Sequence, residues 1–281
     1  IHEAWQMGAT EQHRVTLPGS TQTNGIGPAY TTKQISNLTP ATEYIGPAWY
    51  WRDIELSNDD CQQVLELYLE RACWESFVWL NGTALGTRDS LVAPHVYDLS
   101  LAAKPGINRL TILVDNANLK NKDANASSKM SEDEELVIEA NSERRLHCGG
   151  HHTSFGGFVW NGITGRIELS VRPRVRISPP QAYPDVAQKR VMVKCNALND
   201  IDVPVAAKLI LDIGDQSTEV DLIVEPGSHQ VVVEVDLREG LRLWDEHSPE
   251  RYALEATIRS AHGVDRHGAE FGMRSLSRIG N

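Results

Sequence analysis

Apolar and polar side chains alternate with a period of two along many short windows of this chain. Such rows occur at Leu65–Leu69, Leu110–Val114 and Ile167–Val171, with polar or charged residues between the apolar ones. Because neighbouring side chains of a strand point to opposite faces, each row predicts a β-strand with one buried face. No window of comparable length keeps a period of 3.6 residues, so the sequence predicts an all-β fold.

Turn residues separate these rows. Asn81-Gly82 lies between the segments SFVWL and TALG and predicts a tight hairpin, and Pro105-Gly106 precedes the row at Leu110. Prolines cluster between Pro173 and Pro184, which suits a connection between domains or an edge strand. Alternation resumes after this cluster, in rows at Val191–Cys195, Leu209–Ile213, Val220–Val224, Val231–Val235 and Tyr252–Ile258. About six or seven short strands in roughly 100 residues predict an immunoglobulin-like sandwich for the second part of the chain.

The composition narrows the class of protein. The chain has 281 residues, enough for two ordinary domains, with 41% apolar and 23% charged residues, as in soluble globular proteins. Its net charge of −11 and the absence of clustered Lys and Arg argue against nucleic acid as a partner. No apolar run approaches the roughly 20 residues of a membrane-spanning helix.

The cysteines and the first residues say less. Cys61 and Cys73 flank what reads as one continuous strand, too long for the two to pair, and all four cysteines are predicted to be free thiols. The chain starts at Ile1 without a leader, which leaves the compartment open. A periplasmic or secreted location is expected if a leader was removed, and a cytoplasmic one otherwise.

Several motifs, in this order and spacing, resemble the two N-terminal domains of glycoside hydrolase family 2, the group of β-galactosidases, β-glucuronidases and β-mannosidases. The matching segments are LPGS (17–20), GPAWYWRDIEL (46–56), WESFVWLNG (74–82), PHVYDLS (94–100), PGINRLTILVDN (105–116), WNGITGRIEL (160–169), LWDEHSPERYALEATI (243–258 with Leu241 before it) and FGMRSL (271–276). The resemblance covers nearly all of the chain. It departs from the family in the polar segment near 117–150, whose residues 131–146 are compatible with a short helix.

The resemblance implies a jelly-roll, galactose-binding-like β-sandwich over residues 1–172 and an immunoglobulin-like β-sandwich over 173–276. Residues 277–281 would then begin the connection to a catalytic (β/α)₈ barrel, which is expected to be absent from this chain. In the family that barrel carries the two catalytic Glu residues of a retaining hydrolysis. We therefore expect no catalytic residue here, and a chain that is inactive although its parent protein is a retaining β-glycosidase.

The best candidate for a functional site is the loop Arg145–Gly162, which holds His151 and His152 among five glycines. In the family, the loop before this strand can reach toward the sugar pocket of the barrel, so carbohydrate binding by these histidines, Trp160 and Asn161 is one interpretation. In the other, which is commoner for such loops, Trp160 is a core or interface residue and the histidines are surface residues. Cys and His also ligate zinc, but their spacing matches no closed zinc site, and no metal or cofactor is predicted.

A second candidate is the aromatic run at Trp49–Arg52. Only one face of this strand can be a stacking platform for sugars, and the other face is expected to fill the core. Trp49 is the residue most suited to carbohydrate binding, although a core or interface position for Trp49 or Trp51 is the simpler interpretation. We interpret Phe77 and Trp79 as structural, with Trp79 packed between the sheets.

The sequence thus favours the accessory, non-catalytic part of a glycosidase that acts on O-glycosidic bonds, supporting and partly lining the sugar site of the barrel. The alternatives are a stand-alone carbohydrate-binding module and a purely structural β-sandwich protein. The expected partner is a carbohydrate substrate, reached through the barrel, and a homo-oligomer is left open. A nucleophile elbow, a P-loop and a dinucleotide fingerprint are absent from the sequence.

Overall fold

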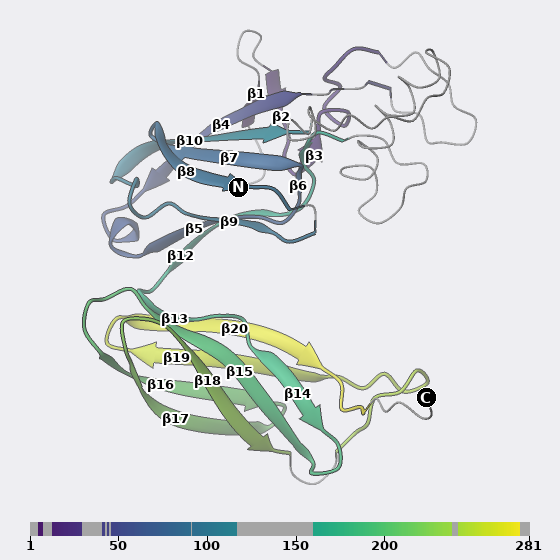
Figure 1. Cartoon of the computed structure of the whole chain (residues 1–281), viewed down its shortest axis with the longest axis vertical. Coiled ribbons are helices and arrows are strands. Elements are labelled where there is room, and N and C mark those ends of the chain that lie inside the picture. The colour runs from purple at the N-terminus through teal and green to yellow at the C-terminus, as the bar shows by residue number, and fades with distance from the viewer. Residues whose placement is uncertain are drawn as a thin grey trace, which may run out of the picture. The chain divides into compact units, whose positions relative to one another are not determined.

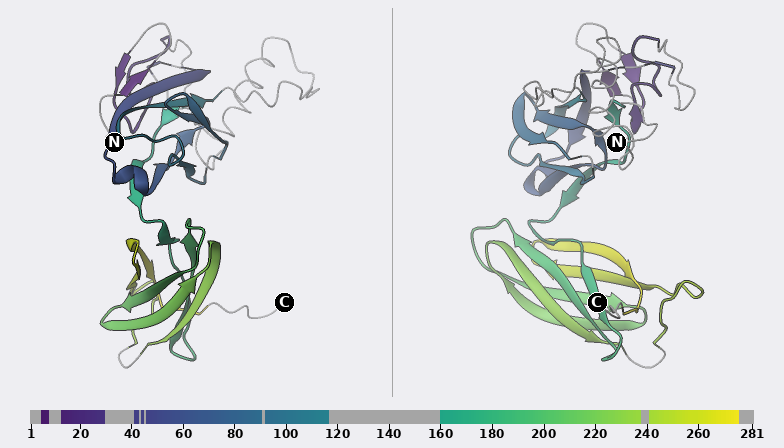
Figure 2. Two further views of the ribbon diagram at one scale, coloured as in Figure 1. Left: turned by 90° about the vertical axis from the view of Figure 1, so that its left-hand side faces the viewer. Right: turned by 45° about the vertical axis from the view of Figure 1, so that its right-hand side comes forward.

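The chain forms two compact units, residues Ile1–Val171 and Arg172–Asn281. The computed structural model describes residues 5–7, 13–29, 41, 42, 44, 46–90, 92–116, 160–237 and 241–275. The segment 131–146, for which a helix was one interpretation, lies outside the described residues. Strands make up the regular structure of both units, as Figures 1 and 2 show.

The first unit contains a six-stranded antiparallel sheet in the order β2-β1-β4-β10-β7-β8. Its strands are β1 (Trp5–Met7), β2 (His13–Val15), β4 (Pro47–Leu56), β7 (Glu75–Leu80), β8 (Thr83–Arg88) and β10 (Gly106–Asp115). Leu80 pairs with Thr83, and both Asn81 and Gly82 between them have positive φ. This two-residue turn is the hairpin that the Asn-Gly pair predicts.

Two smaller sheets form the other layer of this unit, in the orders β3-β11-β6 and β12-β5-β9 (Figure 1). Their strands are β3 (Gly19–Ser20), β5 (Val64–Leu69), β6 (Ala72–Cys73), β9 (His95–Asp98), β11 (Gly162–Ile163) and β12 (Ile167–Arg172). A single 3₁₀ turn among the described residues, η1 (Asp60–Gln62), precedes β5.

The core of the first unit follows from the alternation of side chains. Tyr50 of β4, Ile112 of β10 and Leu80 of β7 point inward and are at most 1% exposed. They join Leu65 and Leu67 of β5 in one hydrophobic cluster. Burying a side chain of this size stabilises a fold by roughly 1.5–3 kcal/mol, so the pattern accounts for the layering.

One expectation about this unit is wrong. The segment Cys61–Cys73 is not a continuous strand. Cys61 lies in η1, and Glu70 and Arg71 interrupt the extended structure between β5 and β6. Cys61, Cys73 and Cys195 are nevertheless free thiols. Burial raises the pKa of the Cys73 thiol to about 11, so this cysteine is a packed side chain rather than a nucleophile.

The second unit is a sandwich of two antiparallel four-stranded sheets. In one, β15 (Arg190–Asn199) pairs with β13 (Val175–Ile177) and β14 (Gln181–Asp185) on one side and with β18 (Gly227–Asp236) on the other. The other has the order β17-β16-β19-β20, with β16 (Val205–Ile213), β17 (Gln216–Val224), β19 (Tyr252–Ser260) and β20 (Gly263–Phe271). This is the immunoglobulin-like architecture expected from the sequence.

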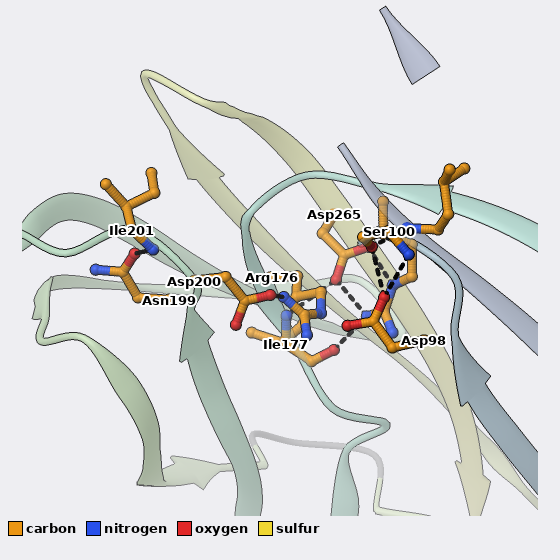
Figure 3. Close-up of polar contacts among 10 residues, drawn as sticks. Asp98, Ser100, Arg176, Ile177, Asn199, Asp200, Ile201 and Asp265 are labelled. Carbon is orange, nitrogen blue, oxygen red and sulfur yellow. Dashed lines mark hydrogen bonds and ion pairs between the residues drawn. The ribbon is translucent and has the colours of Figure 1, made fainter. Parts of the chain in front are cut away.

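Polar contacts hold the first strand of the second unit in place. Arg176 of β13 forms an ion pair with Asp200, and Ile177 donates its backbone N–H to Asp265 of β20 at 2.9 Å (Figure 3). Arg172 donates to the same carboxylate at 2.7 Å and to the carbonyl of Ile177 at 2.6 Å. The carboxylate of Asp265 therefore ties β13 to β20 across the two sheets.

Candidate functional site

A polar cluster gathers at the end of the first unit where β4 begins and β10 ends. The Asn116 side chain accepts the N–H of Gly46 at 2.9 Å and donates to the carbonyl oxygens of Tyr44 and Trp160 at 3.1 and 3.2 Å. The Asn161 side chain donates to the carbonyl of Gly46 at 2.6 Å. These contacts join Asn116 to Trp160, the described residues on either side of the segment 117–159.

Two of the residues predicted to bind carbohydrate belong to this cluster. Asn161 is fully buried, and its side-chain amide donates a hydrogen bond to the backbone. Its Oδ1 has no hydrogen-bond partner among the described residues. Its observed contacts hold β4 in place, while Trp160 beside it is half-buried. His151 and His152 lie outside the described residues. Carbohydrate binding by these four residues stays a prediction.

A row of aromatic side chains covers the outer face of the six-stranded sheet. The rings of Trp49 on β4 and Trp79 on β7 stack with centroids 5.3 Å apart and planes 29° apart. Phe77 lies 6.3 Å from Trp79 with the two planes only 15° apart. Leu113 of β10 pairs in register with both Trp49 and Phe77. The two tryptophans therefore meet above the strand that separates them.

Polar side chains border this row. Thr111 of β10 pairs with Trp51 on one side and Trp79 on the other. Further along, Arg109 of β10 forms an ion pair with Asp53 of β4, and its Nη2 donates a hydrogen bond to Oδ2 at 2.9 Å. The hydrogen bond from Arg109 lowers the pKa of Asp53, and the same bond raises the pKa of the guanidinium. This end of the row thus carries one ion pair, and Glu75 and Asp115 pair in register on the same face at its other end.

The structure corrects the interpretation of Trp79. Val78 and Leu80 of β7 are the fully buried residues between the sheets, whereas Phe77 and Trp79 point to the opposite face and are half-buried. The alternation along WESFVWLNG carried this information, because residues on either side of Val78 cannot share its face. Trp49 belongs to the same outer row, and Tyr50 fills the core.

A second buried network lies next to β7. The Ser76 Oγ is 2.6 Å from His95 Nδ1 and 2.7 Å from the Tyr97 hydroxyl, and His95 Nε2 is 2.8 Å from the carbonyl of Ser90. All three side chains of the core network, Ser76, His95 and Tyr97, are at most 1% exposed. The arrangement holds the loop after β8 against β9, and its serine is out of reach of any substrate.

This network makes the first unit sensitive to acid. Burial lowers the pKa of His95, and the hydrogen bond to the backbone of Ser90 opposes this shift only in part. The unfolded histidine has a pKa near 6.5, so the unfolded chain binds more protons as the pH falls below about 6.5. We expect the free energy of unfolding to fall from that pH down to the lowered pKa and then to level off.

Urea unfolding measured from pH 7.5 to pH 5 checks this expectation. A His95→Gln variant is expected to show a shallower dependence on pH, and the exposed-residue control His262→Gln is expected to keep the slope of the unsubstituted protein. Equal slopes in all three proteins would contradict the assignment of the effect to His95.

Neither a metal-binding group nor a membrane-spanning helix is found among the described residues. Among them, no group of three or more His, Cys, Asp or Glu side chains could hold a metal ion. No helix in the described part of the chain is long and apolar enough to cross a bilayer.

The chain is an all-β two-domain protein. Each domain is an antiparallel sandwich, and the first has a jelly-roll-type pair of layers. No family model matches the sequence. A curated relative, "Putative beta-glucuronidase" of Formosa agariphila, is 23% identical over 228 residues, which are 79% of this chain and 24% of the relative.

Solved structures give the same result at the level of the fold. A β-glucuronidase of Bacteroides uniformis matches with a TM-score of 0.67 and 16% identity over 97% of this chain and 32% of its own. A β-galacturonidase of Eisenbergiella tayi bound to galacturonate matches with a TM-score of 0.68 and 16% identity, over 98% and 43%. A family 2 member from Bacteroides cellulosilyticus matches with a TM-score of 0.68 and 14% identity, over 99% and 36%.

The resemblance to the N-terminal domains of glycoside hydrolase family 2 is therefore confirmed. The chain spans about a quarter of the curated relative and between 32% and 43% of the three solved chains described above.

Proposed function

We propose that this chain is the non-catalytic part of a family 2 β-glycosidase, and that it braces the barrel and lines part of its sugar site. The observation that carries the proposal is the extent of the match, since nearly the whole chain aligns with less than half of each solved relative. The named relatives include a β-glucuronidase and a β-galacturonidase, which supports a carbohydrate as the substrate of the longer protein.

Four carboxyl groups of the described residues have a lowered pKa. Their resolved pKa shifts, at Asp53, Asp60, Glu70 and Glu219, are all downward, because hydrogen bonds from neighbouring side chains or backbone favour the ionised form. A general acid in a glycosidase needs the opposite shift, toward a carboxyl that keeps its proton near neutral pH. These four carboxyl groups therefore serve in ion pairs and turns.

The position of the polar cluster supports a role in lining a site. The segment that carries His151 and His152 ends at Trp160, whose carbonyl is held by Asn116. Trp160 lies two residues before β11 with its carbonyl held in place, so its side chain can be presented to a neighbouring domain with little loss of entropy. Trp160, His151 and His152 would then contribute an aromatic face and hydrogen-bonding groups to a sugar.

The test is hydrolysis by the purified 281-residue chain. We expect no release of 4-nitrophenol from its β-galactoside, β-glucuronide and β-mannoside above the rate in buffer, because the two carboxyl groups of a retaining mechanism must face each other about 5 Å apart. Turnover that co-purifies with the chain and survives a second chromatographic step would overturn the proposal.

A second function has one specific observation in its favour. The aromatic row of Trp49, Trp79 and Phe77 is a feature that a stand-alone carbohydrate-binding module would use. This alternative and the accessory role make different demands on the same surface, since only the module needs the row to bind sugar by itself.

A further inference from the structure

We propose that His267 is a pH-sensitive latch in the second unit. The neutral imidazole leaves the carboxylate of Asp265 to Arg172, and the protonated imidazole competes with Arg172 for it. Arg172 is the first residue of this unit, so the latch decides how firmly the chain is held where it enters the unit. It is independent of the proposed function and needs no carbohydrate ligand.

Alternation along β20 brings the members of the latch together. Gly263, Asp265 and His267 are two residues apart, so they share one face of the strand. A Cβ at Gly263 would lie 3.1 Å from the side chain of Pro173. Asp265 and His267 both contact Arg172. One face of β20 therefore holds the first two residues of the unit.

The contact between Arg172 and His267 requires a neutral imidazole. Nη2 of Arg172 lies 2.7 Å from Nε2 of His267. A guanidinium only donates hydrogen bonds and keeps its proton, so Nε2 has to offer its lone pair and the ring proton sits on Nδ1. Protonation replaces that lone pair by an N–H group and brings two positive charges into contact. The side chain of His267 is 27% exposed, so protons from the solvent reach it.

Oδ2 of Asp265 is the atom for which the groups compete. It accepts Nη2 of Arg172 at 2.7 Å and the backbone N–H of Ile177 at 2.9 Å. These two donors fill its two lone pairs. Nε2 of His267 is 4.0 Å from the same oxygen. A protonated imidazole therefore pairs with Oδ2 only by displacing a donor that is already there.

Arg172 is the donor that gives way. The imidazolium repels the positive guanidinium, whereas the peptide N–H of Ile177 carries no net charge. Nη2 of Arg172 also has two hydrogens for three acceptors, because it donates to the carbonyl of Ile177 at 2.6 Å as well. It keeps this carbonyl as a partner when it loses the carboxylate, so the change leaves no buried donor of Nη2 without any acceptor.

The charged groups of the neighbouring strands face away from His267 or have partners of their own. On β19, the residue in register with His267 is Ala256, which is neutral. On β13, Arg176 is ion-paired with Asp200, and on β14 the carboxylate of Asp185 accepts the backbone N–H of Gln188. By alternation, the opposite faces of β19 and β20 carry Glu255, Arg259, Arg266 and Glu270.

NMR of the full 281-residue chain tests the latch. At pH 7.5, the ring nitrogen signals of His267 are expected to show the tautomer with its proton on Nδ1. The Nε–H of Arg172, which donates to Asp265 Oδ1 at 3.3 Å, is expected to exchange with solvent more slowly than that of a free arginine. A histidine outside the contact takes up its proton near pH 6.5, and one proton changes an equilibrium by at most about tenfold per pH unit. This protection is therefore expected to fall several-fold between pH 7.5 and pH 5.5, with about tenfold as the limit.

Two variants assign the effect. His267→Gln keeps a polar side chain that takes up no proton, so the pH dependence of the protection is expected to disappear. His229→Gln removes an exposed histidine of β18 and is the matched control, which is expected to keep the full pH dependence.

Three results would overturn the latch. They are a proton on Nε2 of His267 at pH 7.5, a protection of the Arg172 Nε–H that is the same at both pH values, and a pH dependence that persists in His267→Gln. The first two are measured on the unsubstituted protein, so they decide the matter even if the variant fails to fold.

Discussion

The substitution Gly162→Ala is expected to lower the unfolding free energy of the first unit by roughly 2–6 kcal/mol, through backbone strain and overpacking. Gly162 has a φ of +134°, which side chains rarely adopt, and a Cβ there would lie 2.5 Å from the carbonyl oxygen of Gly19 and 2.9 Å from Ser20 Cα. Both neighbours are backbone atoms of β3, which pairs directly with β11. They cannot move aside without breaking the sheet β3-β11-β6.

Urea unfolding followed by tryptophan fluorescence measures this effect, because six of the seven tryptophans precede residue 161. The matched control is Gly268→Ala in β20, where the nearest atom to an added Cβ is the carbonyl oxygen of Leu254 at 3.9 Å, an ordinary contact. That variant is expected to be close to neutral. A Gly162→Ala protein as stable as the control would show that β3 and β11 do not approach as closely as described.

The substitution Asp265→Ala is expected to destabilise the second unit by about 3–5 kcal/mol, because it leaves a largely buried guanidinium without its carboxylate partner. The side chains of Arg172 and Asp265 are only 15% and 8% exposed. The carboxylate also accepts the backbone N–H of Ile177 at 2.9 Å, so its loss leaves a second donor unpaired. Each unpaired buried donor adds a desolvation cost of about 1–3 kcal/mol.

Hydrogen exchange of peptides from β13 and β20 reports on this change locally. The control is Glu270→Ala in the same strand β20, which breaks an ion pair with Arg251 whose two side chains are 58% and 64% exposed. An exposed pair contributes only about 0–1 kcal/mol, so the control is expected to be mild. If the two substitutions cost the same, the Arg172–Asp265 pair would have to be as solvated as the surface pair.

The candidate site was only partly predictable. The alternation along GPAWYWRDIEL separates Trp49 from the core residue Tyr50, and the prediction that only one face could be a platform followed from it. The place of Trp79 was interpreted wrongly, because its position before a hairpin turn was weighed above the alternation with Val78 and Leu80. That Trp49 and Trp79 meet was not readable at all, since they come from strands that are both paired to β10 and not to each other.

By itself, the sequence determined the all-β class, the hairpin at Asn81-Gly82 and the inward faces of β5, β10, β15 and β16, because each depends on neighbours along one strand. Only the tertiary structure decided which strands lie side by side. That order places Trp49 next to Trp79, Asp265 between Arg172 and Ile177, and Gly162 against Gly19. These contacts join residues far apart in the chain, and no local pattern encodes a distance that the packing of separate strands creates.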